Sequence, residues 1–274
     1  MRQNGSSVTS ATQLSGICDF TLASYRELLR KLQSTHQFAT FAQFDGAAKG
    51  NRPIALLRHD IDYTIEDALT MARFEAELGV SATYFLLFSS PTYNLLAPGN
   101  ISAPRTIREL GHEVGLHYDV GAIMEAGGDP QQVLRAQARL LGELSGAHVA
   151  SIAMHNPSLG GEDLFREAAY NNAYAPRFCK SYYSDSCMAW RDNFVAAYCK
   201  RAFEGDLQLL IHPCLWTERK LSRRQKLQRI YSKVEEGIRA QQRASQAIWT
   251  NHSGAAEHDA REGALTVLRG KAAG

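Results

Sequence analysis

Two carboxylates and an imidazole lie close together in the segment RHDID, residues 58–62, directly after an apolar run typical of a buried strand. Side chains alternate along a strand, so Asp60 and Asp62 are expected on one face and His59 on the other. Two like charges held this close need a cation, a shared proton or a division into acid and base. Thr64 is available to cap the following helix. The aspartate pair therefore predicts a catalytic or metal-binding role.

Three further histidines follow segments that read as strands: His117, His155 and His212. The last two each lead into a turn that contains proline. A single histidine of this kind is more often a satisfied core or surface residue than a ligand. Several strand ends carrying Asp and His are harder to explain by packing, because carboxylate and imidazole bind divalent metals and transfer protons near neutral pH. Parallel α/β folds carry their chemistry at such strand ends.

An alternation of strand-like and helix-like segments positions these residues and favours one parallel sheet, closed as a single (β/α) barrel. The predicted strands are 53–59, 82–88, 114–118, and the segments ending at His155 and at His212. The predicted helices are 22–32, 64–78, 104–110, one capped by Asp129 with Pro130 at its first position, and 162–170. The predicted division is a flexible arm over 1–20, the barrel domain over 21–250 and a tail over 251–274.

The order of these motifs resembles that of the polysaccharide deacetylases, the NodB-homology or carbohydrate esterase type, in a divergent branch whose first motif reads HD-x-D. The resemblance covers about residues 52–216 and implies the distorted seven-stranded barrel of that family. It implies that Asp60 is the catalytic base, Asp62 and His117 are metal ligands, and His212 is the general acid.

Two positions depart from the family pattern. Gly121 stands where the second motif has a further histidine ligand, so the third ligand is expected to be His155, with Asp119, His59 or water as alternatives, unless the metal is absent. The third motif lacks its usual arginine, and Arg191 is the candidate to replace that positive charge.

A segment rich in aromatic and polar residues, 180–192, is predicted to recognise the substrate, because exposed aromatic rings stack on sugars while Asp and Arg bind their polar groups. The candidates are Tyr183, Asp185, Trp190 and Arg191. The alternative is a loop whose aromatic side chains pack in the core.

The composition is that of a globular enzyme: 274 residues, 45% hydrophobic, with a formal net charge of +2 that favours neither nucleic acid nor membrane as a partner. The basic segment 218–243 is interpreted as the solvated face of an amphipathic helix whose apolar stripe packs on the barrel. Five cysteines without a C-x-x-C pair, and the absence of an apolar leader or membrane-length segment, predict a cytoplasmic protein.

Together with the strand-end residues, the resemblance implies a metal-dependent hydrolase that removes an N-acyl group, foremost acetyl, from an amino sugar of a glycan or of its nucleotide- or lipid-linked precursor. The expected cofactor is a divalent transition metal, Zn²⁺ first, with Mn²⁺, Co²⁺ or Ni²⁺ as alternatives. Two other functions stay open: a metal-independent amide hydrolase on the same fold, and a catalytically silent carbohydrate-binding protein.

Overall fold

The computed structural model describes residues 16–47, 51–157, 169–191, 193–200 and 203–271, and for residues 251–271 it describes the backbone alone. The chain divides into two compact units, residues 1–227 and 228–274. Most of the helix predicted over 162–170 lies outside the described residues.

The first unit contains one eight-stranded sheet in which every strand pairing is parallel. The strand order is β6-β5-β4-β3-β2-β8-β7, and β1 pairs with the start of β2. The bounds are β1 Gln37–Ala39, β2 Ile54–Ile61, β3 Thr83–Leu87, β4 Glu113–Tyr118, β5 Ser151–Met154, β6 Asn171–Asn172, β7 Tyr182–Ser184 and β8 Leu207–Ile211. The predicted parallel α/β architecture is therefore confirmed.

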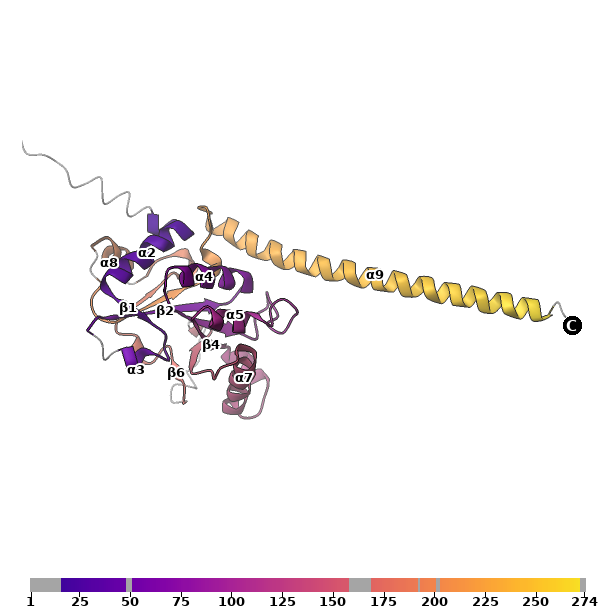
Figure 1. Ribbon diagram of the computed structural model, residues 1–274, viewed down its shortest axis with the longest axis horizontal. Helices are drawn as coiled ribbons and strands as arrows, with labels where there is room; N and C mark the ends of the chain where they lie inside the picture. The colour runs from indigo at the N-terminus through magenta and orange to yellow at the C-terminus, as the bar shows by residue number, and fades with distance from the viewer. Residues whose placement is uncertain (1–15, 48–50, 158–168, 192, 201–202, 272–274) are drawn as a thin grey trace, which may run out of the picture. The chain divides into compact units, whose positions relative to one another are not determined.

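Helices connect the strands, and α4, α5 and α7 pack side by side along the sheet (Figure 1). Their bounds are α2 Leu22–Thr35, α3 Phe44–Ala47, α4 Ile65–Glu77, α5 Ala103–Glu109, α6 Val120–Glu125, α7 Pro130–Ser145, α8 Phe194–Lys200 and α9 Arg223–Lys271. Three short 3₁₀ turns are η2 Pro176–Phe178, η3 Ser186–Met188 and η4 Pro213–Leu215. As predicted, Asp129 caps α7, and its carboxylate accepts a hydrogen bond from the Gln131 N–H at 3.0 Å.

The two faces of the sheet are buried in different cores. Leu57 and its counterparts on the neighbouring strands pack under the helices, whereas Leu56 belongs to a second cluster inside the curve of the sheet, together with Phe85 and Phe178. This inner core is tight: a Cβ at Gly115 would lie 2.5 Å from the Phe85 ring, so only glycine fits on β4 at that position.

Gln208 shows that the sheet curls on itself. Its side chain on β8 donates hydrogen bonds to the carbonyl oxygens of Ala173 at 2.9 Å and Phe178 at 3.2 Å, both of which follow β6 at the other end of the strand order. In the described part of the chain, β6 and β7 do not pair with each other. The sheet is therefore an open, curled barrel, with the carboxyl ends of its strands gathered at one rim.

The second unit consists of α9 from residue 228 onward, and the helix runs without interruption through residue 250, where the sequence predicted the end of a domain. Within this unit, Ile230 is buried, whereas Ile238 is 65% exposed and Trp249 is 70% exposed. Among the described residues, no helix combines the length and apolar character needed to span a bilayer.

Candidate metal centre and active site

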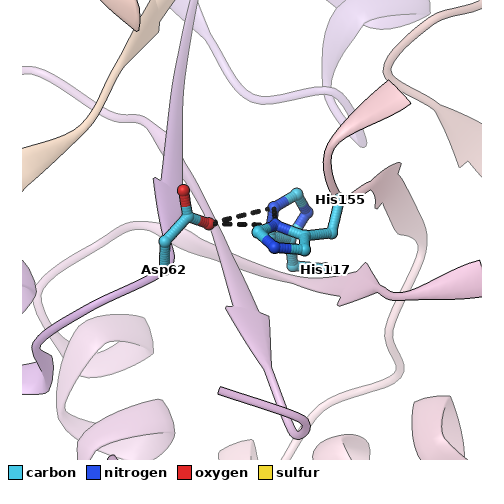
Figure 2. Close-up of side chains that lie close together, drawn as sticks. All are labelled: Asp62, His117 and His155. Carbon is cyan, nitrogen blue, oxygen red and sulfur yellow. Dashed lines mark hydrogen bonds and ion pairs between the residues drawn. The ribbon is translucent and has the colours of Figure 1, made fainter. Parts of the chain in front are cut away.

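Three side chains converge at the carboxyl rim of the sheet, where Asp62 follows β2, His117 lies near the end of β4 and His155 follows β5 (Figure 2). Oδ1 of Asp62 lies 3.2 Å from Nε2 of His117 and 3.4 Å from Nδ1 of His155. The two ring nitrogens are 3.2 Å apart. One carboxylate and two imidazoles brought together in this way form an arrangement that binds divalent transition metals.

The donor atoms also fit a cation chemically. His117 donates its Nδ1–H to the Ala153 carbonyl oxygen at 2.8 Å, so its Nε2 presents a lone pair to Asp62. Oδ1 of Asp62 is buried and accepts no well-aligned hydrogen bond among the described residues, and its nearest polar neighbours are the two imidazole nitrogens. A buried carboxylate oxygen without a donor is costly unless a cation neutralises it. The predicted ligands Asp62, His117 and His155 are therefore brought together, and they suit a metal ion.

The electrostatics keep the carboxylate ionised. Burial alone would raise the pKa of Asp62, but His117 and His155, which face it, hold that pKa well below its usual range. Burial would lower the pKa of His155, but Asp62 raises it. Asp62 is thus an anion at neutral pH, as a metal ligand must be.

The alternative third ligands lie elsewhere. The ring of His59 faces the helix side of the sheet, where its Nε2 lies 2.7 Å from Glu75. Asp119 caps α6 and accepts a hydrogen bond from the Ala122 N–H at 3.2 Å. Gly121, in the first turn of α6, offers no ligand atom, and a Cβ there would lie 3.2 Å from Asp119 Oδ1. Of the residues proposed as the third ligand, His155 alone lies beside Asp62 and His117. These three side chains are called the metal triangle below.

Asp60 lies on the inner face of β2, two residues before Asp62. Its two oxygens accept hydrogen bonds from Nε and Nη2 of the fully buried Arg58, both at 2.8 Å. Burial opposes ionisation, but Arg58, and after it His117, lower the pKa of Asp60 below its usual value. Asp60 Oδ2 lies 3.7 Å from His117 Nε2, so this carboxylate borders the metal triangle.

His212 follows β8 and approaches the same site, with its Nε2 3.8 Å from Asp62 Oδ2. Its Nδ1 donates to Asp185 Oδ1 at 2.6 Å, and the Trp216 indole N–H donates to Asp185 Oδ2 at 2.8 Å. Burial would lower the pKa of His212, but Asp185 raises it to about 9. The ring is therefore a cation at neutral pH, with a proton on the nitrogen that faces the site.

Asp185 was predicted to contact substrate, and the structure corrects that prediction. Its side chain is completely buried, and both oxygens also accept from the His212 backbone N–H. A carboxylate enclosed in this way orients His212 instead of reaching a sugar.

The aromatic candidates of the 180–192 segment lie on the helix side of the sheet. Trp190 stacks on Phe194 with ring centroids 3.8 Å apart and donates its indole N–H to the Ile17 carbonyl oxygen. Tyr183 packs against Phe194 at 5.5 Å. The alternative interpretation, packing in the core, accounts for both rings, whereas Arg191 is exposed and its role stays a prediction.

Two tyrosines that the sequence analysis did not single out face the inside of the barrel. The Tyr174 hydroxyl accepts a hydrogen bond from Arg58 Nη2 at 2.8 Å, and the Arg58 guanidinium lies 4.5 Å from the Tyr174 ring centroid. Tyr182 lies close enough for Arg58 to influence its pKa, which burial raises. Strand alternation predicts that Tyr182 and Tyr183 face opposite sides of the sheet, but it does not predict which of the two faces inward.

No family model matches the sequence, and no curated protein matches it significantly. Solved structures do align with it. A carbohydrate esterase family 4 pseudoenzyme from Bacillus anthracis gives a TM-score of 0.41 with 16% identity, over 68% of this chain and 62% of that chain. The peptidoglycan deacetylase PdaC from Bacillus subtilis gives 0.40 with 13% identity, over 72% and 96%. The chitin deacetylase from Colletotrichum lindemuthianum gives 0.38 with 15% identity, over 67% and 84%.

All three alignments give TM-scores below 0.5 and identities below 25%. The chain spans less than two thirds of the length of the pseudoenzyme. At these TM-scores and identities the similarity carries no activity over to this chain, and the activity must be argued from its own residues.

Proposed function

We propose that this protein is a metal-dependent hydrolase that removes an N-acyl group, foremost acetyl, from an amino sugar. The observation that carries the proposal is the orphaned Oδ1 of Asp62 inside a triangle completed by His117 and His155. A proton acceptor and a proton donor border this triangle: Asp60 lies 3.7 Å from His117, and His212 lies 3.8 Å from Asp62.

Asp62, His117 and His155 would hold the ion, and their mixed oxygen and nitrogen donors suit Zn²⁺, with Mn²⁺, Co²⁺ and Ni²⁺ as alternatives. A divalent cation in such a site polarises an acyl carbonyl and lowers the pKa of the attacking water.

The residues around the ion supply the proton transfers. Asp60, kept ionised by Arg58, accepts a proton from the attacking water as the water oxygen bonds to the acyl carbon. His212, kept protonated by Asp185, gives its Nε2 proton to the sugar nitrogen as the carbon–nitrogen bond breaks. The products are the carboxylic acid and the free amino sugar.

The test follows free-amine release from N-acetylated amino sugars, their oligomers and their nucleotide conjugates, with the protein loaded with Zn²⁺. Asp60→Asn and His212→Gln are each expected to lower turnover by about 10²–10⁴-fold, the range typical of general acid–base groups. His148→Gln, at an exposed histidine, is the matched control and should leave turnover unchanged. Circular dichroism and zinc content must be measured for each variant, because Asp60 is part of a buried ion pair.

Three results would count against the proposal. Amine release that survives a strong chelator would favour the metal-independent hydrolase. Sugar binding without release of amine from any substrate would favour the carbohydrate-binding protein. Equal turnover by the wild type and both site variants would remove Asp60 and His212 from the mechanism.

A further inference from the structure

Asn156 follows the proposed ligand His155 and has a backbone conformation that few residues adopt. Its φ is +46°, in the left-handed region, which asparagine tolerates better than most residues with a side chain. Its amide nitrogen lies 2.8 Å from His155 Nε2, the ring nitrogen on the side away from the metal triangle.

The hydrogen bonds of His117, His155 and Asn156 indicate which ring nitrogen of each histidine carries a proton. The Ala153 carbonyl oxygen can only accept, so His117 carries its proton on Nδ1 and offers Nε2 as an acceptor. His155 Nδ1 lies 3.2 Å from that acceptor and therefore donates to it. The Asn156 amide nitrogen can only donate, so His155 Nε2 accepts. In this state His155 has its proton on Nδ1, the atom that faces Asp62.

A metal ion needs the other tautomer. For His155 Nδ1 to offer a lone pair, the proton must be on Nε2, and that proton then needs an acceptor. A half-turn of the Asn156 amide exchanges its nitrogen for its oxygen at nearly the same place, and the two atoms are nearly indistinguishable in shape. One amide can therefore serve both tautomers.

We propose that Asn156 is a positioning residue: with its amide oxygen turned toward the ring, it accepts the Nε2 proton of His155, holds the tautomer that binds metal through Nδ1, and thereby raises the affinity of the site for its metal. The inference rests on the proposed function, because it assumes that His155 binds the ion through Nδ1. The left-handed backbone conformation of Asn156 contributes to this role, because it directs the side-chain amide back toward the ring of His155.

The test measures Zn²⁺ affinity of the purified full-length chain by competition with a chromogenic chelator. Asn156→Gly keeps the left-handed backbone and removes the amide, and it is expected to weaken Zn²⁺ binding about 10–100-fold, the usual effect of losing a partner of a metal-bound histidine. Asn156→Asp keeps an acceptor for the Nε2 proton and should retain or exceed wild-type affinity. Measuring at about 0.5 M NaCl screens the general attraction of the added charge.

Asn193→Gly is the matched control, because Asn193 also has a left-handed φ, +58°, and is exposed. It should bind Zn²⁺ as the wild type does. The absorption spectrum of bound Co²⁺ gives a second readout, since a change in histidine coordination alters it while a general loss of stability does not.

The outcomes separate this inference from the proposed function. If Asn156→Gly binds Zn²⁺ as tightly as Asn193→Gly, or if Asn156→Asp is as weak as Asn156→Gly, tautomer selection is refuted and the metal-dependent hydrolase stands. If the wild type itself binds no Zn²⁺, both are refuted.

Discussion

Arg58 and Asp60 lie two residues apart on β2, so both side chains face the inside of the barrel. Besides Asp60, Arg58 donates to the Tyr174 hydroxyl and to Gln208 Oε1, the latter at 3.2 Å. The arginine thus joins the proposed base to the segments after β6 and to β8. Arg58 directly precedes the HD-x-D motif and places a positive charge beside the proposed base, while the role of Arg191 stays a prediction.

Removing Arg58 would leave a buried, unpaired carboxylate. We expect Arg58→Gln to lower the free energy of unfolding by about 3–5 kcal/mol, the usual cost of breaking a buried ion pair from one side. The double variant Arg58→Gln/Asp60→Asn should recover part of this loss, because it removes the unpaired charge. Urea unfolding of the single and double variants measures the coupling, and simple additivity would contradict it.

Asp185 gives a second prediction about a single residue. Asp185→Asn should lower kcat by about 10²–10⁴-fold with little change in KM or zinc content, because it leaves His212 without the anion that orients it and keeps it protonated. Steady-state kinetics on the best substrate of the panel measure both constants. An increase in KM alone would indicate that Asp185 acts in substrate binding, as first predicted.

Among the elements, β2 carries a buried hydrogen-bond network on the face opposite Asp60. His59 lies 2.7 Å from Glu75 of α4, and the same carboxylate accepts hydrogen bonds from the hydroxyls of Tyr25 at 2.5 Å and Tyr84 at 2.8 Å. A slip of one residue would exchange the two faces of the strand. The network therefore keeps Asp60 facing the site while His59 faces the helices.

His112 belongs to the same region and predicts how stability depends on pH. Its Nδ1 accepts from the Ala82 N–H and its Nε2 donates to the Ala72 carbonyl oxygen, so the neutral ring is fully bonded. Burial lowers the pKa of His112 below the ordinary 6.5, although Glu75 opposes the shift. The His112 ring therefore binds a proton more readily in the unfolded chain than in the folded chain. The stabilisation contributed by the buried neutral ring is complete above about pH 6.5 and is lost as the pH falls through the lower pKa of the folded state.

We therefore expect His112 to contribute a fall in the free energy of unfolding between about pH 7 and pH 5, opposed by His155 and His212, whose pKa values are raised, and we expect His112→Gln to remove that contribution. His36 should contribute in the same direction as His112, because burial also lowers the pKa of His36. Urea unfolding over this pH range measures the slope in the wild type and in the variant. An unchanged slope in the variant would show that His112 does not titrate with folding.

Sequence patterns were sufficient to predict the strand ends and their alternation, which place Asp60, Asp62, His117, His155 and His212 at one rim. The patterns were not sufficient to predict which way the side chains of Asp185, Tyr182 and Tyr183 point. β7 has only three residues, and the direction of its side chains depends on its register with β8, where Ser184 pairs with Leu210. A strand that short shows no readable period.

At the scale of the whole molecule, the proposed ligands belong to segments that are distant along the chain. In the sheet order, β2 and β4 are separated by β3, and β5 lies beyond β4. Asp62 and His155 therefore meet after four parallel strands have paired, each pair joined by a helical connection. The site is a property of the assembled sheet and not of any local segment.

In this arrangement the proposed metal ion would stabilise the folded chain and would not nucleate folding. An ion that binds the native state alone stabilises that state by mass action. Contacts that form after the folding transition state slow unfolding and leave the refolding rate unchanged. Stopped-flow fluorescence of the three tryptophans should show slower unfolding and unaltered refolding in saturating Zn²⁺. Faster refolding would mean that the segments after β2 and β5 meet before the folding barrier is crossed.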